Sequence, residues 1–259
     1  MSRIQKAFEN KKAFIAFLTA GDPSLDKTEE YILEMERAGA DLIEIGIPFS
    51  DPIAEGPVIQ EADIRALSGG ATTDDIFDMV KKLREKTEIP LVFMTYLNPV
   101  FHYGYEAFFE RCQDVGIDGI IIPDLSFEEK EEVDVVASRY GIDLISMIAP
   151  TSKERIRKIA KGAKGFLYVV SSMGVTGERT NITTDIGGML KEIRSVSSVP
   201  AAVGFGIHTP DQAAEISKTA DGVIVGSAVV KLIAKYGSHA GRHLYTYVRM
   251  MKETVRHSE

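Results

Sequence analysis

The sequence contains a single cysteine and no segment long enough to cross a bilayer. Cys112 can form no internal disulfide, as is typical of a protein from a reducing compartment. No apolar run approaches the roughly 20 residues that a membrane-spanning helix needs. The apolar run from Ala13 to Leu18 follows basic residues, as in a secretory signal, but it is short and Glu9 interrupts the basic region. We therefore expect a cytoplasmic protein without a membrane anchor.

The sequence also has no excess of basic residues. The chain has 30 Lys and Arg against 38 Asp and Glu, which gives a formal net charge of -8. A surface that binds nucleic acid or an anionic membrane needs clustered Lys and Arg. We therefore expect neither partner, and an anionic substrate would have to be bound by local groups.

The histidines lack the spacing of metal ligands. The five histidines share no such spacing with one another or with Cys112, apart from His239 and His243, which are four residues apart. We interpret that pair as a solvated helix face. The sequence therefore predicts no metal site.

Short apolar runs rich in Ile and Val alternate with longer amphipathic segments along all 259 residues, without a linker or low-complexity stretch. This alternation is typical of a βα repeat. We expect strands at Phe14–Leu18, Leu42–Ile47, Leu91–Thr95, Gly119–Ile122, Leu144–Ile148, Phe166–Val170, Ala201–Val203 and Val223–Val225.

Helices are expected between these strands and at both ends of the chain. Their ranges are Ser2–Glu9, Ser24–Ala38, Val58–Leu67, Asp74–Lys86, Tyr105–Val115, Glu128–Tyr140, Lys153–Ala160, Ile186–Arg194, Asp211–Lys218 and Ser227–Thr254. Eight strands favour an α/β protein with a single (β/α)8 TIM barrel over residues 1–259, with extra N-terminal and C-terminal helices. An open doubly wound sheet is the alternative.

The second expected strand carries a carboxylate that a buried strand should not tolerate. Ile43, Ile45 and Ile47 alternate with Glu44, so the isoleucines face a helix layer and Glu44 points into the interior. Burial raises the pKa of a carboxyl group toward neutrality, which suits a general acid or base. A structural ion pair with an interior Lys or Arg is the alternative. A stiff loop rich in Pro and Gly follows and brings Glu55 close to the same strand end.

In a barrel of this kind the functional groups lie at the carboxyl ends of the strands. Several polar side chains of the sequence fall there or in the loops that follow. They are Glu44, Asp51, Glu55, Tyr96, Asn98, Asp124 and Tyr168.

Glycines after the last two strands indicate a phosphate site. Gly204 and Gly206 follow strand seven, and Gly226 precedes a helix that begins near Ser227. Main-chain N–H groups and a helix N-terminus can bind an anion without Lys or Arg. Thr176 and Gly177, in the polar loop from Ser171 to Thr184, could complete the cradle, and this loop could close over a substrate.

Six segments together resemble the tryptophan synthase alpha subunit family. They are LTAGDP (Leu18–Pro23), IEIGIPFSDPIAEGP (Ile43–Pro57), PD (Pro123–Asp124), GVTGER (Gly174–Arg179), GFGI (Gly204–Ile207) and VGSAVV (Val225–Val230). The resemblance covers nearly the whole chain. It implies a (β/α)8 lyase that cleaves indole-3-glycerol phosphate to indole and glyceraldehyde 3-phosphate in L-tryptophan biosynthesis. It also implies an α2β2 heterotetramer with a beta subunit that receives the indole and carries PLP, and no organic cofactor or metal in this chain.

The resemblance also assigns roles to individual residues. Glu44 matches the acid/base glutamate that protonates indole C3 and helps to move the glycerol hydroxyl proton. Glu55 matches the carboxylate that receives the indole N–H proton. The family forms best known have Asp at position 55, so the side chain here is one methylene longer. Phe17, Tyr96, Asp124, Tyr168 and Thr176 match substrate-binding positions, Gly177, Gly206, Gly226 and Ser227 match the phosphate site, and Asp51, Asn98 and Pro99 match the surface that faces the beta subunit.

Three other functions fit the same residues less well. Strands seven and eight alone would serve a phosphate-binding barrel that uses flavin or forms a different carbon–carbon bond. A regulatory subunit without strong turnover would keep the barrel and the partner surface, but retention of both carboxylates argues against it. A stand-alone lyase that releases free indole is the third alternative.

Overall fold

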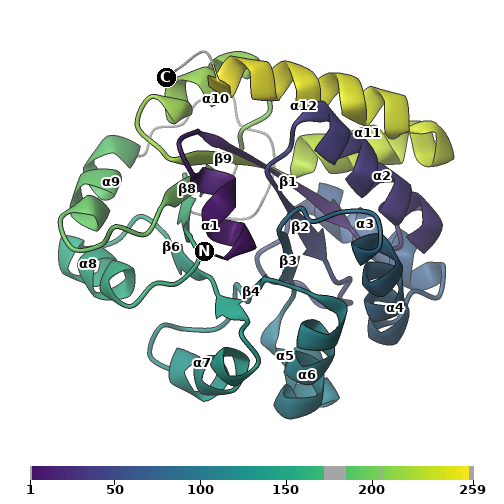
Figure 1. The fold of residues 1–259 in the computed structure, drawn as a ribbon, viewed down its shortest axis with the longest axis horizontal. Coiled ribbons are helices and arrows are strands. Elements are labelled where there is room, and N and C mark those ends of the chain that lie inside the picture. Colours follow the sequence, from purple (N-terminus) through teal and green to yellow (C-terminus); the bar gives the residue numbers. More distant parts are fainter. Residues whose placement is uncertain (1, 172–184, 205, 257–259) are drawn as a thin grey trace.

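The computed structural model describes residues 2–171, 185–204 and 206–256. Within these ranges the strands form one parallel sheet that closes into a barrel, and helices surround it (Figure 1). The strands are β1 (Ala13–Thr19), β2 (Leu42–Gly46), β3 (Leu91–Met94), β4 (Gly119–Ile121), β5 (Asp143–Leu144), β6 (Ser146–Ile148), β7 (Leu167–Val170), β8 (Ala201–Gly204) and β9 (Gly222–Val225). The (β/α)8 prediction is confirmed, and the open sheet is excluded.

The helices follow the strands in alternation, as the sequence predicts. They are α1 (Arg3–Phe8), α2 (Leu25–Ala38), α3 (Pro57–Ser68), α4 (Thr73–Arg84), α5 (Leu97–Tyr103), α6 (Tyr105–Val115), α7 (Lys130–Arg139), α8 (Lys153–Lys161), α9 (Ile186–Arg194), α10 (Pro210–Ser217), α11 (Ser227–Tyr236) and α12 (Gly241–Arg256), with a 3₁₀ turn η1 (Gly237–His239). None of the described helices is both long enough and apolar enough to span a membrane.

The fifth predicted strand is broken in two. Its first part, β5, pairs with β4, and its second part, β6, pairs with β7. Ile145 lies between them and donates its N–H to Ile120 O at 2.9 Å, so the chain remains continuous with the sheet. Strands in a closed barrel are staggered. A short strand can therefore pair with one neighbour through its N-terminal half and with the other neighbour through its C-terminal half. One predicted strand thus accounts for two observed ones.

Helix α5 was not expected from the sequence. In the structure Pro99 is the third residue of α5, where its missing N–H would have no partner inside the helix. The helix ends at Gly104, which has φ +91°. Asn98 and Pro99 therefore lie on the first turn of a helix.

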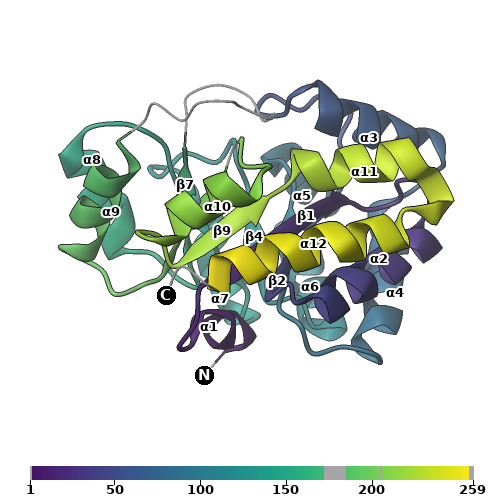
Figure 2. The ribbon, with the colours of Figure 1, turned by 90° about the horizontal axis from the view of Figure 1, so that it is seen from above.

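Two apolar cores lie on opposite sides of the sheet. The outer core packs the strands against the helices and includes Ile43, Ile45 and Ile47, as predicted. The inner core fills the barrel and includes Phe17 and Tyr168. Helix α1 covers one end of the barrel, opposite to the end where α3 begins (Figures 1 and 2).

A buried ion pair joins the last helix to the amino end of the barrel. Lys252 on α12 is 1 % exposed, and its Nζ donates to Asp41 Oδ2 at 2.6 Å and to Lys12 O at 2.7 Å. Asp41 also accepts the Phe14 N–H at 2.7 Å. The C-terminal helix is thereby attached to β1 and to the start of β2.

Candidate active site

Glu44 lies inside the barrel, in register with Phe17 of β1 and Val92 of β3. The residue is 1 % exposed, and its Oε1 has no hydrogen-bond partner. No ion pair involving Glu44 occurs within the described part of the chain. Burial, and secondly the charge of Glu55, raise the pKa of Glu44 from 4.5 to about 8. This geometry favours the acid/base interpretation over the structural ion pair.

Glu55 lies in the loop between β2 and α3 and is 5 % exposed. Its Oε1 accepts a hydrogen bond from the Tyr96 hydroxyl at 3.4 Å, and that hydroxyl accepts the Ala54 N–H at 2.9 Å. Tyr96 is itself buried at the N-terminus of α5. The structure therefore brings together Glu44, Glu55 and Tyr96, which the sequence placed after two neighbouring strands.

Two aromatic side chains of the barrel interior each pack against a glycine of the next strand. A Cβ on Gly46 would lie 2.7 Å from Cζ of Phe17, and a Cβ on Gly204 would lie 2.5 Å from the Tyr168 hydroxyl oxygen. Burial, followed by the charges of Glu44 and Glu55, raises the pKa of Tyr168 well above its ordinary value. Phe17 and Tyr168 thus lie near the two acids, and their contact with substrate stays a prediction. Gly204, expected just after the strand, is instead the last residue of β8 and accommodates Tyr168.

The glycines predicted to bind phosphate lie at the ends of β8 and β9. Gly206 is buried with φ +90°, a conformation that favours glycine. Gly226 is the N-cap of α11 and Ser227 is its first residue, so N–H groups of the first turn are available to an anion. A Cβ on Gly226 would meet Phe17 Cβ at 3.5 Å, so this helix end borders the aromatic part of the site. Thr176, Gly177 and the rest of the predicted lid lie outside the described residues.

Asp124 and the predicted partner residues lie on the surface. Asp124 is exposed, and its Oδ1 accepts the Leu97 N–H at 2.9 Å, which caps α5. Asp51 and Asn98 are exposed and Pro99 is half-buried. Ile53 and Phe101, in the same two segments, are 73 % and 65 % exposed. Large apolar side chains so exposed are typical of a protein interface.

Sequence reasoning missed Asp63, a buried acid next to Glu55. Asp63 is 6 % exposed on α3, and burial, then the charge of Glu55, raise its pKa from 3.8 to about 8. The sequence could have indicated that Asp63 is buried, because it has the helical spacing of the apolar residues of α3. The buried residues of this helix, which form one stripe, are Ile59, Ala62, Asp63 and Ala66. An Asp on such a stripe indicates a buried acid.

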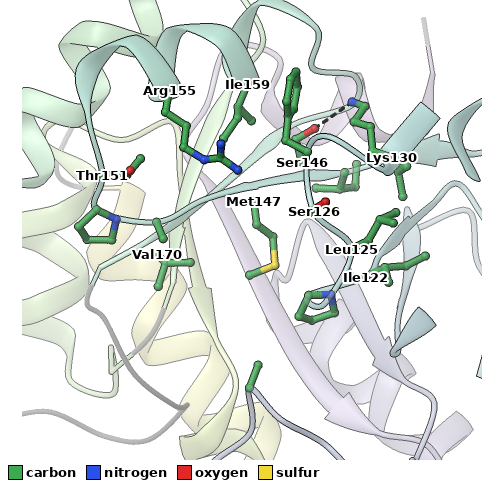
Figure 3. Close-up of a pocket in the computed structure, with 17 residues that line it drawn as sticks. Ile122, Leu125, Ser126, Lys130, Ser146, Met147, Thr151, Arg155, Ile159 and Val170 are labelled. Atoms are coloured by element: carbon green, nitrogen blue, oxygen red, sulfur yellow. Dashed lines mark hydrogen bonds between the residues drawn. The ribbon is translucent and has the colours of Figure 1, made fainter. Parts of the chain in front are cut away.

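A cavity of about 540 Å³ opens beside the loop that carries Glu55 (Figure 3). Ala54 is among its lining residues, and Lys130 and Val170 lie on different sides of it; Lys130 donates to Ser146 Oγ at 3.2 Å (Figure 3). Of the expected substrate residues that the structure describes, Phe17, Tyr96, Asp124 and Tyr168, none lines it. The other lining residues are Ile122, Pro123, Leu125, Ser126, Phe127, Leu144, Ile145, Met147, Ala149, Pro150, Thr151, Arg155 and Ile159.

These features define a class of protein: a (β/α)8 barrel with a buried acid at the carboxyl end of β2, a second carboxyl beside it and a helix N-terminus suited to a phosphate. In the described ranges no three His, Cys, Asp or Glu side chains gather as a metal-ligand set. The arrangement can deliver a proton to one atom of a substrate and remove a proton from another.

Comparisons with known proteins identify the family. A family model described as tryptophan synthase alpha chain matches residues 4–256. The tryptophan synthase alpha chain of Lacticaseibacillus casei is 48% identical over 255 residues, which are 98% of this chain and 96% of the relative. That of Lactiplantibacillus plantarum is 50% identical over 256 residues, or 98% and 97% of the two chains. The chain belongs to the tryptophan synthase alpha chain family.

Solved structures agree with this assignment. The crystal structure of the tryptophan synthase alpha chain from Legionella pneumophila has a TM-score of 0.89 and 35% identity, and the match covers 98% of this chain and 97% of that one. A chain from the tryptophan synthase α2β2 complex of Pyrococcus furiosus has a TM-score of 0.86 and 36% identity, with 93% and 98% covered.

Proposed function

We propose that this chain, as the alpha subunit of tryptophan synthase, cleaves indole-3-glycerol phosphate to indole and glyceraldehyde 3-phosphate in L-tryptophan biosynthesis. The observation that carries the proposal is the 1 % exposed carboxyl group of Glu44 inside the barrel, whose Oε1 has no hydrogen-bond partner. The family and its alpha chain relatives support the same activity.

Cleavage of the bond between ring C3 and the side chain is a retro-aldol step, which needs a proton on the carbon and removal of one from a hydroxyl group. Glu44, with a pKa of about 8, carries a proton at neutral pH and can donate it to C3. As the carbon–carbon bond breaks and the aldehyde forms, the Glu44 carboxylate accepts the glycerol hydroxyl proton. Glu55, whose carboxyl group accepts a hydrogen bond from Tyr96, receives the indole N–H proton and returns it to the ring nitrogen of the released indole. Proton transfers of this kind need no organic cofactor or metal in this chain, and we assign PLP to the beta partner alone.

The remaining site residues divide into a ring end and a phosphate end. Phe17, Tyr96 and Tyr168 line the indole ring, and we retain Asp124 and Thr176 as substrate contacts. Gly177, Gly206, Gly226 and Ser227 bind the phosphate, chiefly through main-chain N–H groups. The chain acts as one catalytic domain over residues 1–259 in the cytoplasm.

The test is an assay of indole release from indole-3-glycerol phosphate. Positioned proton transfer contributes roughly 10² to 10⁴ in rate, so Glu44→Gln should bind substrate and lose turnover by about that factor. Glu88→Gln is the matched control, because Glu88 is exposed and pairs with Arg3. Near-normal single-turnover activity of Glu44→Gln would refute the assignment.

The beta subunit binds where Asp51, Asn98 and Pro99 adjoin the exposed Ile53 and Phe101. Asp51→Lys should weaken activation of indole release by a beta subunit, whereas Asp78→Lys, on the exposed face of α4, should not. Activity that is identical with and without a beta subunit would favour a stand-alone lyase instead.

A further inference from the structure

Asp63 connects three segments at the mouth of the barrel. Its Oδ1 accepts a hydrogen bond from the Thr19 hydroxyl at 3.5 Å, at the end of β1. Its carboxyl group also accepts the backbone N–H of Phe49, in the loop after β2. Since Asp63 itself lies on α3, one side chain holds the start of the Glu55 loop between β1 and α3.

The contacts continue from Phe49 to Glu55. The ring of Phe49 packs on the ring of Tyr96, with centroids 5.5 Å apart. The Tyr96 hydroxyl contacts both Glu55 Oε1 and the Ala54 N–H. Both ends of the loop therefore contact buried polar side chains, and Glu55 is one of the residues held at its second end.

The charged groups around Asp63 disfavour its ionisation. Glu55 and Asp22 are the charged groups that act on it, and both raise its pKa. Arg65, on the same helix, is bound to Asp22 by two hydrogen bonds of 2.9 and 2.8 Å. No ion pair of the described side chains includes Asp63. The buried carboxyl groups of Glu55 and Asp63 are neighbours, so they cannot both ionise readily, and their titrations are coupled.

We propose that Asp63 is a positioning residue for the lyase reaction: as an uncharged acid it holds the loop of residues 49–55 in place, so that Glu55 keeps the one negative charge of the pair. The inference rests on the role proposed above for Glu55. A charged Glu55 can accept the indole N–H proton, whereas ionisation of Asp63 at alkaline pH disrupts this arrangement.

The first experiment compares Asp63→Asn, Asp63→Ala and wild type across pH 6 to 9.5. Asn keeps the acceptor for Thr19 and Phe49 and cannot ionise. Glu44 and Asp63 both have pKa values of about 8. As the pH rises, wild type should therefore lose activity through deprotonation of both acids, and Asp63→Asn through deprotonation of Glu44 alone. Relative to its rate at pH 7, Asp63→Asn should retain about tenfold more activity at pH 9 than wild type does.

Two other variants separate positioning from a general effect on folding. Asp63→Ala lacks the acceptor and should lower kcat at every pH. Asp78→Asn removes an exposed carboxylate of α4 and should reproduce the wild-type pH profile. A profile of Asp63→Asn that coincides with wild type at every pH would overturn the inference.

The second experiment needs no turnover. In protein labelled with ¹³C at the Asp carboxyl groups, the Asp63 signal, assigned by its loss in Asp63→Asn, should titrate well above the ordinary range of Asp. In Glu55→Gln it should titrate at a lower pH. If wild type cleaves the substrate but the titration of the Asp63 signal is the same in Glu55→Gln as in wild type, this inference alone would be overturned. A wild-type protein with no lyase activity would overturn the proposed function and the role of Asp63 in that reaction.

Discussion

Replacing Glu44 by Gln should change how the stability of the protein depends on pH. The carboxyl group has a pKa of about 8 in the folded chain against 4.5 for an exposed one. A raised carboxyl pKa means that the folded state holds its proton more tightly than the unfolded state. Stability from this group is therefore present at low pH and is lost as pH rises from about 4.5 to about 8.

The magnitude follows from the two pKa values. At about 1.4 kcal/mol per pKa unit, the ionised Glu44 costs the folded state about 5 kcal/mol at a pH above both values. Between pH 5 and pH 8 the wild-type protein should lose about 3 to 4 kcal/mol through this group. Gln cannot ionise and should show no such loss. Burial of its amide without a partner adds a cost of about 1 to 3 kcal/mol that does not vary with pH.

The assay is urea unfolding of wild type and Glu44→Gln at several pH values from 5 to 8.5, followed by circular dichroism. The free energy of unfolding of the variant, minus that of wild type, should rise by about 3 to 4 kcal/mol across this range. Because both proteins contain Asp63, its own titration largely cancels in the difference. Glu88→Gln is the control and should give no such rise. A difference for Glu44→Gln that stays constant with pH would refute the buried, protonated acid.

Three further perturbations test other parts of the structure. Gly46→Ala would place a Cβ 2.7 Å from Phe17 Cζ and should lower kcat/KM for indole-3-glycerol phosphate by about tenfold or more, whereas Gly162→Ala, with nothing within 4 Å, should not. Lys252→Met leaves Asp41 with Lys11 as its remaining cation, and loss of the buried donor should lower the free energy of unfolding by about 1 to 3 kcal/mol in urea titrations. Asp124→Ala removes the cap of α5 at a cost of about 1 kcal/mol and should weaken binding of a beta subunit, measured by titrating the activation of indole release.

The alternation of strands and helices could be predicted because it depends on local pattern. The predicted helix Ser24–Ala38 corresponds to α2, and the Ser24 hydroxyl caps it by accepting the Lys27 N–H at 3.3 Å. Gly39, directly after the predicted range, ends the helix with φ +108°. The inward direction of Glu44 follows from the period of two along β2 together with helices that cover the other face. Each of these inferences needs only neighbours in sequence and the general rules of βα packing.

Features that depend on neighbours far apart in sequence could not be predicted. The break at Ile145 arises because β5 pairs with β4 and β6 pairs with β7, and this stagger belongs to the closed barrel. Gly204 was expected in the loop after strand seven, but it ends β8, and the space beside it is filled by Tyr168 of the adjacent strand. Asp124 caps the N-terminus of α5, a helix that was not expected from the sequence.

Burial of the acids also explains how an acidic protein can bind a phosphorylated substrate. If Glu44, Glu55 and Asp63 were all ionised, three negative charges would lie in the barrel mouth near the end that binds phosphate. With pKa values of about 8, Glu44 and Asp63 are mostly uncharged at neutral pH, so two of these three charges are largely absent. Desolvation therefore has two consequences at once. In the mechanism proposed above, it keeps a proton on Glu44 for transfer to carbon, and it reduces the repulsion between the acids and the phosphate that we propose is bound by main-chain groups at Gly226 and Ser227.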